Sequence, residues 1–274
     1  LISNMKKKVG GYRVEEEISK SPLGSLYKAV HIDNETDKAI ILTIDRGIIK
    51  EKYFEEFKEN VTQLMLLEDE CITKIKQMTY TKSHIYVFFD YPNNFTPLSA
   101  FIKKSRKPVN EKNLKKIFRH LLEFTDYLKK QEAQVNHLVP ELIFYNSSYR
   151  IRAAPPIFDP LLHHKKLRSK YAKLCSQTSA IPIPSELEDG EVFQSKKSQS
   201  KALVWSFGQI MGSLTAKDAK VTTKSLEGIM KEEELSSDFK KLLKKMVAED
   251  AENRISLKKL EEDSWFKKRV KKVT

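Results

Sequence analysis

The chain has 274 residues, of which 40% are apolar and 32% charged, and its formal net charge is +13. These values are typical of a soluble globular protein that is long enough for a sizeable core, as one large domain or two small ones. No stretch of about 18 or more apolar residues occurs, which argues against a membrane-spanning helix. Two cysteines are too few for a disulfide framework or a metal quartet. We therefore expect an intracellular location, cytoplasmic or nuclear.

The first third of the chain consists of short β-branched and aromatic runs that turn residues separate. Such runs predict strands. The expected strands span residues 12–18, 26–32, 39–45, 75–81 and 85–91. Between the third and fourth strands, residues 51–67 carry apolar side chains at helical spacing and predict one helix.

Helical patterns dominate the chain after a linker at residues 91–97. Apolar periodicity and serine caps predict helices. The expected helices span residues 98–103, 111–130, 200–214, 236–248 and 256–262. Five strands with one embedded helix, followed by a helical part, predict an α+β bilobal fold. For residues 163–201 a loop is expected, with a binding surface as the alternative.

The stretch from 135 to 142 reads Val-Asn-His-Leu-Val-Pro-Glu-Leu and resembles the catalytic loop of protein kinases, His-Arg-Asp-Leu-Lys-Pro-Glu-Asn. Leu138, Pro140 and Glu141 retain its skeleton. His137 occupies the slot of the catalytic aspartate, and Leu142 occupies that of the metal-binding asparagine. Neither residue is suited to the family's task, so the resemblance implies a kinase fold with a non-catalytic use.

Residues 18–29 resemble the glycine-rich loop and second strand of a serine/threonine kinase. Gly24 is kept, whereas Ser19 and Ser21 occupy the first two glycine slots. Backbone N–H groups approach phosphates closely only where no side chain intrudes, so this loop is predicted to hold phosphates poorly.

Further positions of the family's catalytic machinery are also substituted. Residues 39–45 resemble the Val-Ala-Ile-Lys strand, with Leu42 in the lysine slot. Asn60, or Glu59 if the register slips by one, falls where the partner glutamate of that lysine belongs. Ala153 falls in the slot of the magnesium-binding aspartate, which removes the carboxylate that a hard cation needs.

Bulky apolar residues fall where the family binds adenine: Leu26, Ile40, Phe89 in the gatekeeper position, and Phe144. The resemblance therefore implies a nucleotide pocket that the chain's own side chains occlude, ahead of a hinge at residues 90–97. Ordinary drift of a core after the loss of catalysis is the alternative explanation, and the sequence leaves both open.

Architectural motifs of the family persist to the end of the chain. Trp205 and Gly208 lie in a stretch that resembles the start of the central helix of the family's helical lobe. Glu186 resembles the glutamate of Ala-Pro-Glu, and Arg254 resembles the arginine with which that residue pairs. These residues are predicted to be structural.

Other candidate residues have simpler interpretations. His137, His163 and His164 are expected to be solvated or hydrogen-bonded histidines, not metal ligands or bases. Asp159, next to a proline, is expected to be a turn residue and not a displaced metal ligand.

The sequence as a whole is identified as a single serine/threonine-kinase-like pseudokinase domain over residues 1–274. Its expected parts are a strand lobe at about 10–91, a hinge at 90–97, a helical lobe at about 98–268 and a basic tail at 267–274. The resemblance implies no enzyme activity, no ATP, metal or cofactor, and a role as a scaffold or allosteric regulator. The expected partner is a protein, which includes a kinase or a multi-protein complex. A basic module that contacts nucleic acid or anionic lipid is the alternative, followed by a kinase with residual activity.

Overall fold

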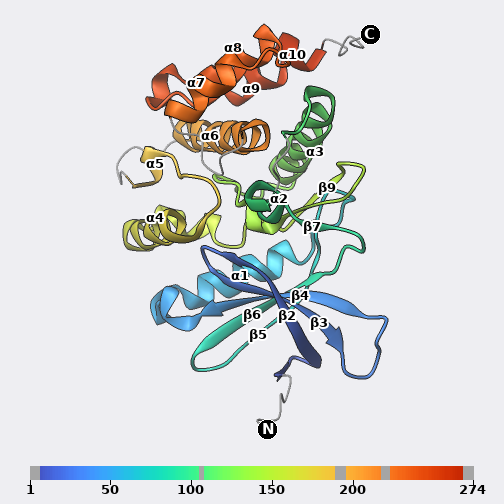
Figure 1. Ribbon diagram of the computed structural model, residues 1–274. Helices are drawn as coiled ribbons and strands as arrows, with labels where there is room; N and C mark the ends of the chain where they lie inside the picture. Colours follow the sequence, from blue (N-terminus) through green and yellow to red (C-terminus); the bar gives the residue numbers. More distant parts are fainter. Residues whose placement is uncertain (1–6, 105–107, 189–195, 217–222, 268–274) are drawn as a thin grey trace.

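The computed structural model describes residues 7–104, 108–188, 196–216 and 223–267 (Figure 1). The first part of the chain forms one antiparallel sheet with the strand order β1-β2-β3-β4-β6-β5. Its strands are β1 Lys8–Val9, β2 Tyr12–Ser21, β3 Gly24–His31, β4 Lys38–Asp45, β5 Ile75–Tyr80 and β6 His84–Asp90. The predicted strands are all present, and the short β1 is an additional one.

Helix α1, Phe54–Leu64, lies within this lobe and follows the short 3-10 turns η1 (Arg46–Ile48) and η2 (Glu51–Tyr53). Its residues Phe54, Phe57, Val61 and Leu64 are buried, as expected for one face of an amphipathic helix. The buried face of the helix therefore packs against the sheet, and the helix lies where the sequence pattern predicts it (Figure 1).

The helical lobe comprises most of the remaining chain. Apart from α4 and α5, which are described below, its helices are α2 Leu98–Lys104, α3 Glu111–Lys130, α6 Lys196–Thr215, α7 Thr223–Lys231, α8 Ser237–Met246 and the short α9 Leu257–Glu261 and α10 Ser264–Lys267. The side chains of Asn110, Ser236 and Ser256 accept backbone N–H bonds at the starts of α3, α8 and α9. The bilobal α+β fold is thus confirmed.

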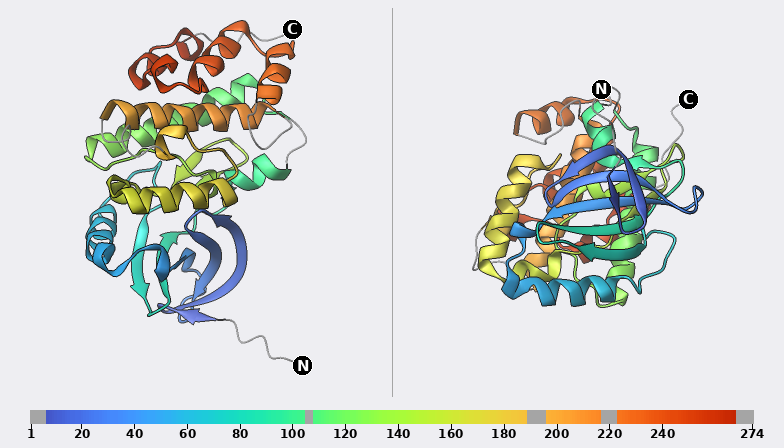
Figure 2. Two further views of the ribbon diagram at one scale, coloured as in Figure 1. Left: turned by 90° about the vertical axis from the view of Figure 1, so that its left-hand side faces the viewer. Right: turned by 90° about the horizontal axis from the view of Figure 1, so that it is seen from below.

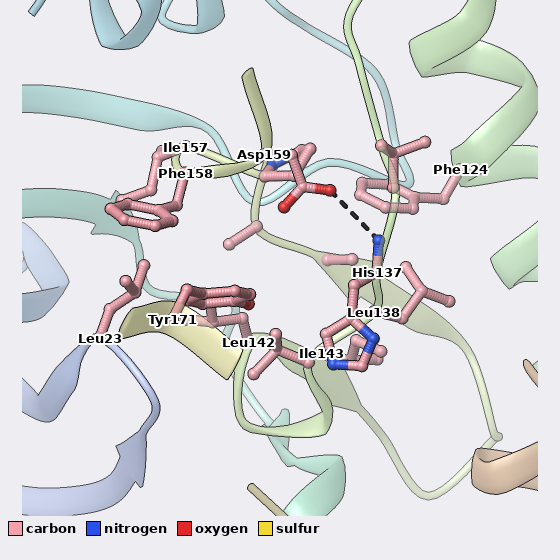
Figure 3. Close-up of a pocket in the computed structure, with 15 residues that line it drawn as sticks. Leu23, Phe124, His137, Leu138, Leu142, Ile143, Ile157, Phe158, Asp159 and Tyr171 are labelled. Carbon is pink, nitrogen blue, oxygen red and sulfur yellow. Dashed lines mark hydrogen bonds between the residues drawn. The ribbon is translucent and has the colours of Figure 1, made fainter. Parts of the chain in front are cut away.

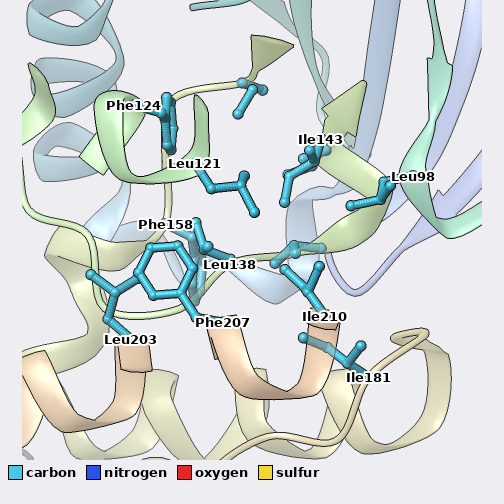
Figure 4. Packing of buried hydrophobic residues seen from close by; sticks show 14 of the residues in the cluster. Leu98, Leu121, Phe124, Leu138, Ile143, Phe158, Ile181, Leu203, Phe207 and Ile210 are labelled. Carbon is cyan, nitrogen blue, oxygen red and sulfur yellow. The ribbon is translucent and has the colours of Figure 1, made fainter. Parts of the chain in front are cut away.

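A second, three-stranded sheet and the central helices enclose the core of this lobe. The strands are β7 Thr96–Pro97, β8 Ile143–Tyr145 and β9 Ile151–Ala153. Leu203, Phe207 and Ile210 of α6 face the loop residues Leu138 and Phe158 (Figure 4). This packing places the loop that contains His137 against α6.

The prediction of a loop at residues 163–201 is wrong for most of its length. Helix α4 spans Lys165–Thr178, and the short α5 spans Ser185–Glu188. Leu167, Tyr171 and Cys175 recur every four residues and are buried, so burial of one face stabilises a helix despite the many lysines. Helix α4 runs along the boundary between the two lobes (Figure 2).

Parts of the predicted organisation fall outside the described residues. These are residues 268–274 of the basic tail and residues 189–195 between α5 and α6. Among the helices that the structure describes, none combines the length and the apolar character that crossing a membrane requires. Cys71 and Cys175 are both buried and unbonded to each other.

Candidate functional site

The boundary between the lobes contains the residues that the family resemblance assigns to the adenine pocket. Leu26, Ile40, Phe89 and Phe144 are all almost completely buried and belong to one continuous apolar cluster. Ile40 lies in the middle of the sheet, opposite Lys28 of β3 and Phe89 of β6. The four side chains are therefore part of the core that joins the two lobes.

The turn between β2 and β3 lies against the helical lobe. A Cβ atom on Gly24, where φ is +152°, would lie 1.9 Å from the carbonyl oxygen of Thr43, so only glycine fits there. The Ser19 hydroxyl lies 3.3 Å from the Ser99 hydroxyl at the start of α2. Leu23, at the tip of the turn, is buried and lines the pocket drawn in Figure 3. The turn thus closes over the position where the family resemblance places phosphates.

His137 is buried in the loop that precedes η3, the 3-10 turn Pro140–Leu142. Its Nδ1 lies 2.7 Å from the hydroxyl of Ser206 on α6. Burial lowers the pKa of His137 to about 4, so the imidazole is neutral at neutral pH. Leu142, the last residue of η3, is buried against the same pocket.

Asp159 lies in a turn, as the sequence suggested, and it also makes buried contacts that the sequence did not predict. It begins the 3-10 turn η4, Asp159–His163, and is buried. Its Oδ2 accepts hydrogen bonds from the backbone N–H groups of Asn136 and His137 (Figure 3). Burial raises the pKa of Asp159 to about 7, against the opposing effect of these two donors. Its role is to hold the backbone of the loop that carries His137.

Pro140 and Glu141 support the same loop from the other side. Pro140 begins η3, where its fixed φ suits a helical start. The Oε1 atom of the buried Glu141 accepts the backbone N–H of Ala180 at 2.8 Å. Burial raises the pKa of Glu141 to about 7. Glu141 therefore links the loop to the segment that follows α4.

Of the two alternatives for the partner-glutamate position, Asn60 faces the other lobe and Glu59 is exposed. The Asn60 side-chain amide donates to the carbonyl of Ile157 at 2.7 Å. Leu42 is buried in the sheet. Ala153 ends β9, and its backbone N–H donates to the carbonyl of Cys71 at 2.9 Å. Leu42 and Ala153 carry no polar side-chain group at the positions where the resemblance places a lysine and an aspartate.

Between the lobes lies an apolar cavity of about 30 Å³. Leu23 of the β2–β3 turn, Phe158 and Tyr171 of α4 line it together, and the rings of the last two are 5.1 Å apart (Figure 3). Such a volume holds a water molecule or two, whereas ligand pockets usually measure about 300–1,000 Å³. His137 and Asp159 also line the cavity, but the Asp159 carboxyl group contacts the backbone of His137 and the imidazole contacts Ser206.

Three of the residues predicted to be structural, Glu186, Trp205 and Arg254, lie together in the helical lobe. Arg254 forms a buried, two-contact ion pair with Glu186 and also donates to the carbonyl of Lys201 at 2.8 Å. The Arg254 guanidinium lies 4.9 Å from the centre of the Trp205 ring. At Gly208 a Cβ atom would lie 2.6 Å from a methyl carbon of Val247, so glycine permits close packing of α6 on α8.

Leu23 and Tyr171 also shape this site but were not among the predicted residues, and the buried role of Asp159 was not predicted either. Tyr171 was detectable, because Leu167, Tyr171 and Cys175 follow a four-residue spacing. Leu23 and Asp159 have no such signal, since their burial depends on contacts between distant segments.

Curated relatives with kinase names match nearly the whole chain. CBL-interacting protein kinase 28 of Oryza sativa subsp. japonica is 22% identical over 268 residues, which cover 94% of this chain and 60% of the relative. CBL-interacting protein kinase 10 of the same plant is 22% identical over 266 residues, covering 93% of this chain and 57% of the relative. The chain thus spans about 60% of the length of these relatives.

The protein tyrosine and serine/threonine kinase family matches residues 12–263. This match and the kinase names of the relatives contradict the prediction that the chain is not an enzyme. That prediction relied on four substituted motif positions, Leu42, His137, Leu142 and Ala153, whereas the family match extends over nearly the whole chain. The chain belongs to the protein tyrosine and serine/threonine kinase family.

Proposed function

We propose that this kinase-family domain acts mainly by binding a protein partner, as a scaffold or allosteric regulator, and that its closed cleft excludes ATP and magnesium. The observation that carries the proposal is the filled space between the lobes. Leu26, Ile40, Phe89 and Phe144 are buried where the family resemblance places adenine. The cavity that Leu23, His137 and Asp159 line measures about 30 Å³, an order of magnitude less than an ordinary ligand pocket.

Nucleotide titrations test the closed cleft. Thermal shift and a fluorescent ATP analogue, each with and without magnesium, are expected to give no response up to millimolar nucleotide. A saturable response in the micromolar range would contradict the proposal. Transfer of radiolabelled phosphate is measured on the same samples, with an active kinase as the positive control, because the chain belongs to an enzyme family.

Helix α4 is the surface that we propose for the partner. One face is buried through Leu167, Tyr171 and Cys175. The other face is exposed and lysine-rich, and its lysines are Lys165, Lys166, Lys170 and Lys173. Since α4 contains no acidic residue, this face favours a partner with an acidic surface. The relatives are named for interaction with CBL, which supports a protein partner as a class.

Charge reversal tests this surface. The triple variant Lys165→Glu, Lys166→Glu, Lys173→Glu is expected to lose the partners that the unaltered protein retains in affinity purification with mass spectrometry. The matched control reverses three exposed lysines of α8, which are Lys241, Lys244 and Lys245. Equal loss, or no loss, in both variants would contradict α4 as the partner surface.

Contact with nucleic acid or anionic lipid is the second candidate, and the net charge of +13 favours it. If this candidate is right, the affinity for a DNA duplex or for anionic vesicles falls steeply as the salt concentration rises. An affinity that does not change with salt would reject this candidate.

The two cysteines are buried and unbonded, which supports our proposal of a reducing intracellular compartment, cytoplasmic or nuclear.

A further inference from the structure

Three potential metal ligands meet at the boundary between the lobes, outside the cavity described above. Glu56 lies on α1, whereas His163 ends η4 and His164 precedes α4. The Nε2 atom of His164 lies 2.8 Å from one Glu56 carboxylate oxygen, and that of His163 lies 3.7 Å from the other. One ligand atom from each residue lies within 4.8 Å of those of the other two.

His163 is oriented as metal-binding histidines usually are, and a neighbouring ring holds His164 in place. The Nδ1 atom of His163 lies 2.7 Å from the carbonyl oxygen of Pro160. A carbonyl only accepts hydrogen bonds, so Nδ1 carries the hydrogen and Nε2 presents its lone pair toward Glu56. Metal-ligating histidines commonly make such a bond from their second nitrogen. The ring of Tyr53 packs on His164 with 4.3 Å between centres, which restricts its rotation.

We propose that Glu56, His163 and His164 form a binding site for a divalent transition metal, with Zn²⁺ as the ion that this ligand set suits best. Two imidazoles and a carboxylate are ordinary zinc ligands, whereas Mg²⁺ and Ca²⁺ prefer oxygen alone. Tetrahedral bonds of about 2.0–2.2 Å place neighbouring ligand atoms about 3.4 Å apart. The observed distances of 2.8 and 3.7 Å, to the two different Glu56 oxygens, bracket that separation, and the ligand atoms of the three residues all lie within 4.8 Å of one another.

The position of the site indicates what the ion would do. Glu56 belongs to the strand lobe, and the two histidines lie where η4 leads into α4 in the helical lobe. A bound ion would therefore tie α1 to the start of α4 and hold the lobes together. Three protein ligands leave a fourth position for water or for a ligand from another molecule. This inference does not depend on the proposed function.

The 274-residue protein, freed of metal by dialysis against EDTA, provides the test. At Zn²⁺ concentrations about 100-fold above Kd, the melting temperature is expected to rise by about 5 °C. Co²⁺ is expected to give visible absorption bands that Zn²⁺ abolishes. The variants His163→Gln and His164→Gln should each lose both effects. The control is His120→Gln, whose histidine pairs with Glu123 alone and should leave both effects intact.

Several results would overturn the site. One is the absence of a Zn²⁺-dependent shift in the unaltered protein. Another is an equal shift in the double variant His163→Gln, His164→Gln or in Glu56→Gln. The side chain of His163 is largely exposed, so its replacement is expected to leave the fold intact, which circular dichroism checks. Neither readout involves nucleotide or a protein partner, so failure of this proposal leaves the proposed function untouched.

Discussion

Replacing Ile40 by alanine distinguishes a packed core from a nucleotide pocket. Ile40 is 1% exposed and faces Phe89 across the central strands. The family usually carries alanine at this position, so in a working pocket the change would create useful space. In a packed cleft it removes three buried carbons, worth about 2.4 kcal/mol of transfer free energy. The cavity left behind adds to this, and we expect a loss of about 3 kcal/mol in the free energy of unfolding.

Urea unfolding, followed by circular dichroism and by fluorescence, measures this loss. Coincident transitions establish that a single free energy describes the molecule. In a thermal scan the same loss corresponds to a decrease of roughly 5–6 °C. The control is Ile32→Ala, since Ile32 is 41% exposed and its truncation should cost less than about 1 kcal/mol. A cost for Ile40→Ala no larger than that of the control would refute the packed cleft.

Three further predictions concern the buried polar groups and the β2–β3 turn. Arg254→Ala removes the guanidinium that neutralises the buried Glu186 carboxylate and should destabilise the protein by about 3–5 kcal/mol in urea unfolding, whereas replacing both residues by apolar ones should cost less. Asp159 has a raised pKa of about 7, so it binds more protons in the folded state than in the unfolded state between pH 4 and 7. The free energy of unfolding of the wild type minus that of Asp159→Asn should therefore decrease as pH rises from 4 to 7 and stay constant above pH 7. A difference that does not change with pH would contradict the burial of Asp159. Gly24→Ala places a Cβ atom against the carbonyl of Thr43 and should cost about 2 kcal/mol or more, and an unchanged melting temperature would contradict this geometry.

The lobes and most of their elements were predictable because their signals are local. Alternation in the strands, the apolar face at residues 111–130 and the serine caps each need only a few neighbouring residues. Helix α4 was mispredicted because its lysines resemble those of a solvated loop, although Leu167, Tyr171 and Cys175 carry the helical period. Tertiary burial of that face outweighed the polar composition.

The candidate site was less accessible to sequence reasoning than the fold. The order of the motifs placed Leu26, Ile40 and Phe144 near one another, because the resemblance to protein kinases indicates which segments lie side by side in the fold. It could not show that Asp159 holds the backbone of the loop that carries His137. Such contacts join segments about twenty residues apart, and only the folded chain brings them together.

The closed cleft has an energetic consequence for any ligand that enters it. Opening must break the Asn60 bond to the helical lobe and the Ser19–Ser99 contact, at about 1 kcal/mol each, and must expose Leu23, at about 2 kcal/mol. A closing free energy on the order of 4 kcal/mol raises the apparent Kd of a nucleotide by a factor of about 10³. A partner that binds only when the two lobes have separated would face the same free energy. Partner and nucleotide would then favour each other's binding by equal factors. Titrating nucleotide with and without a partner measures that coupling, and equal affinities in the two titrations would show that the partner does not select the separated lobes.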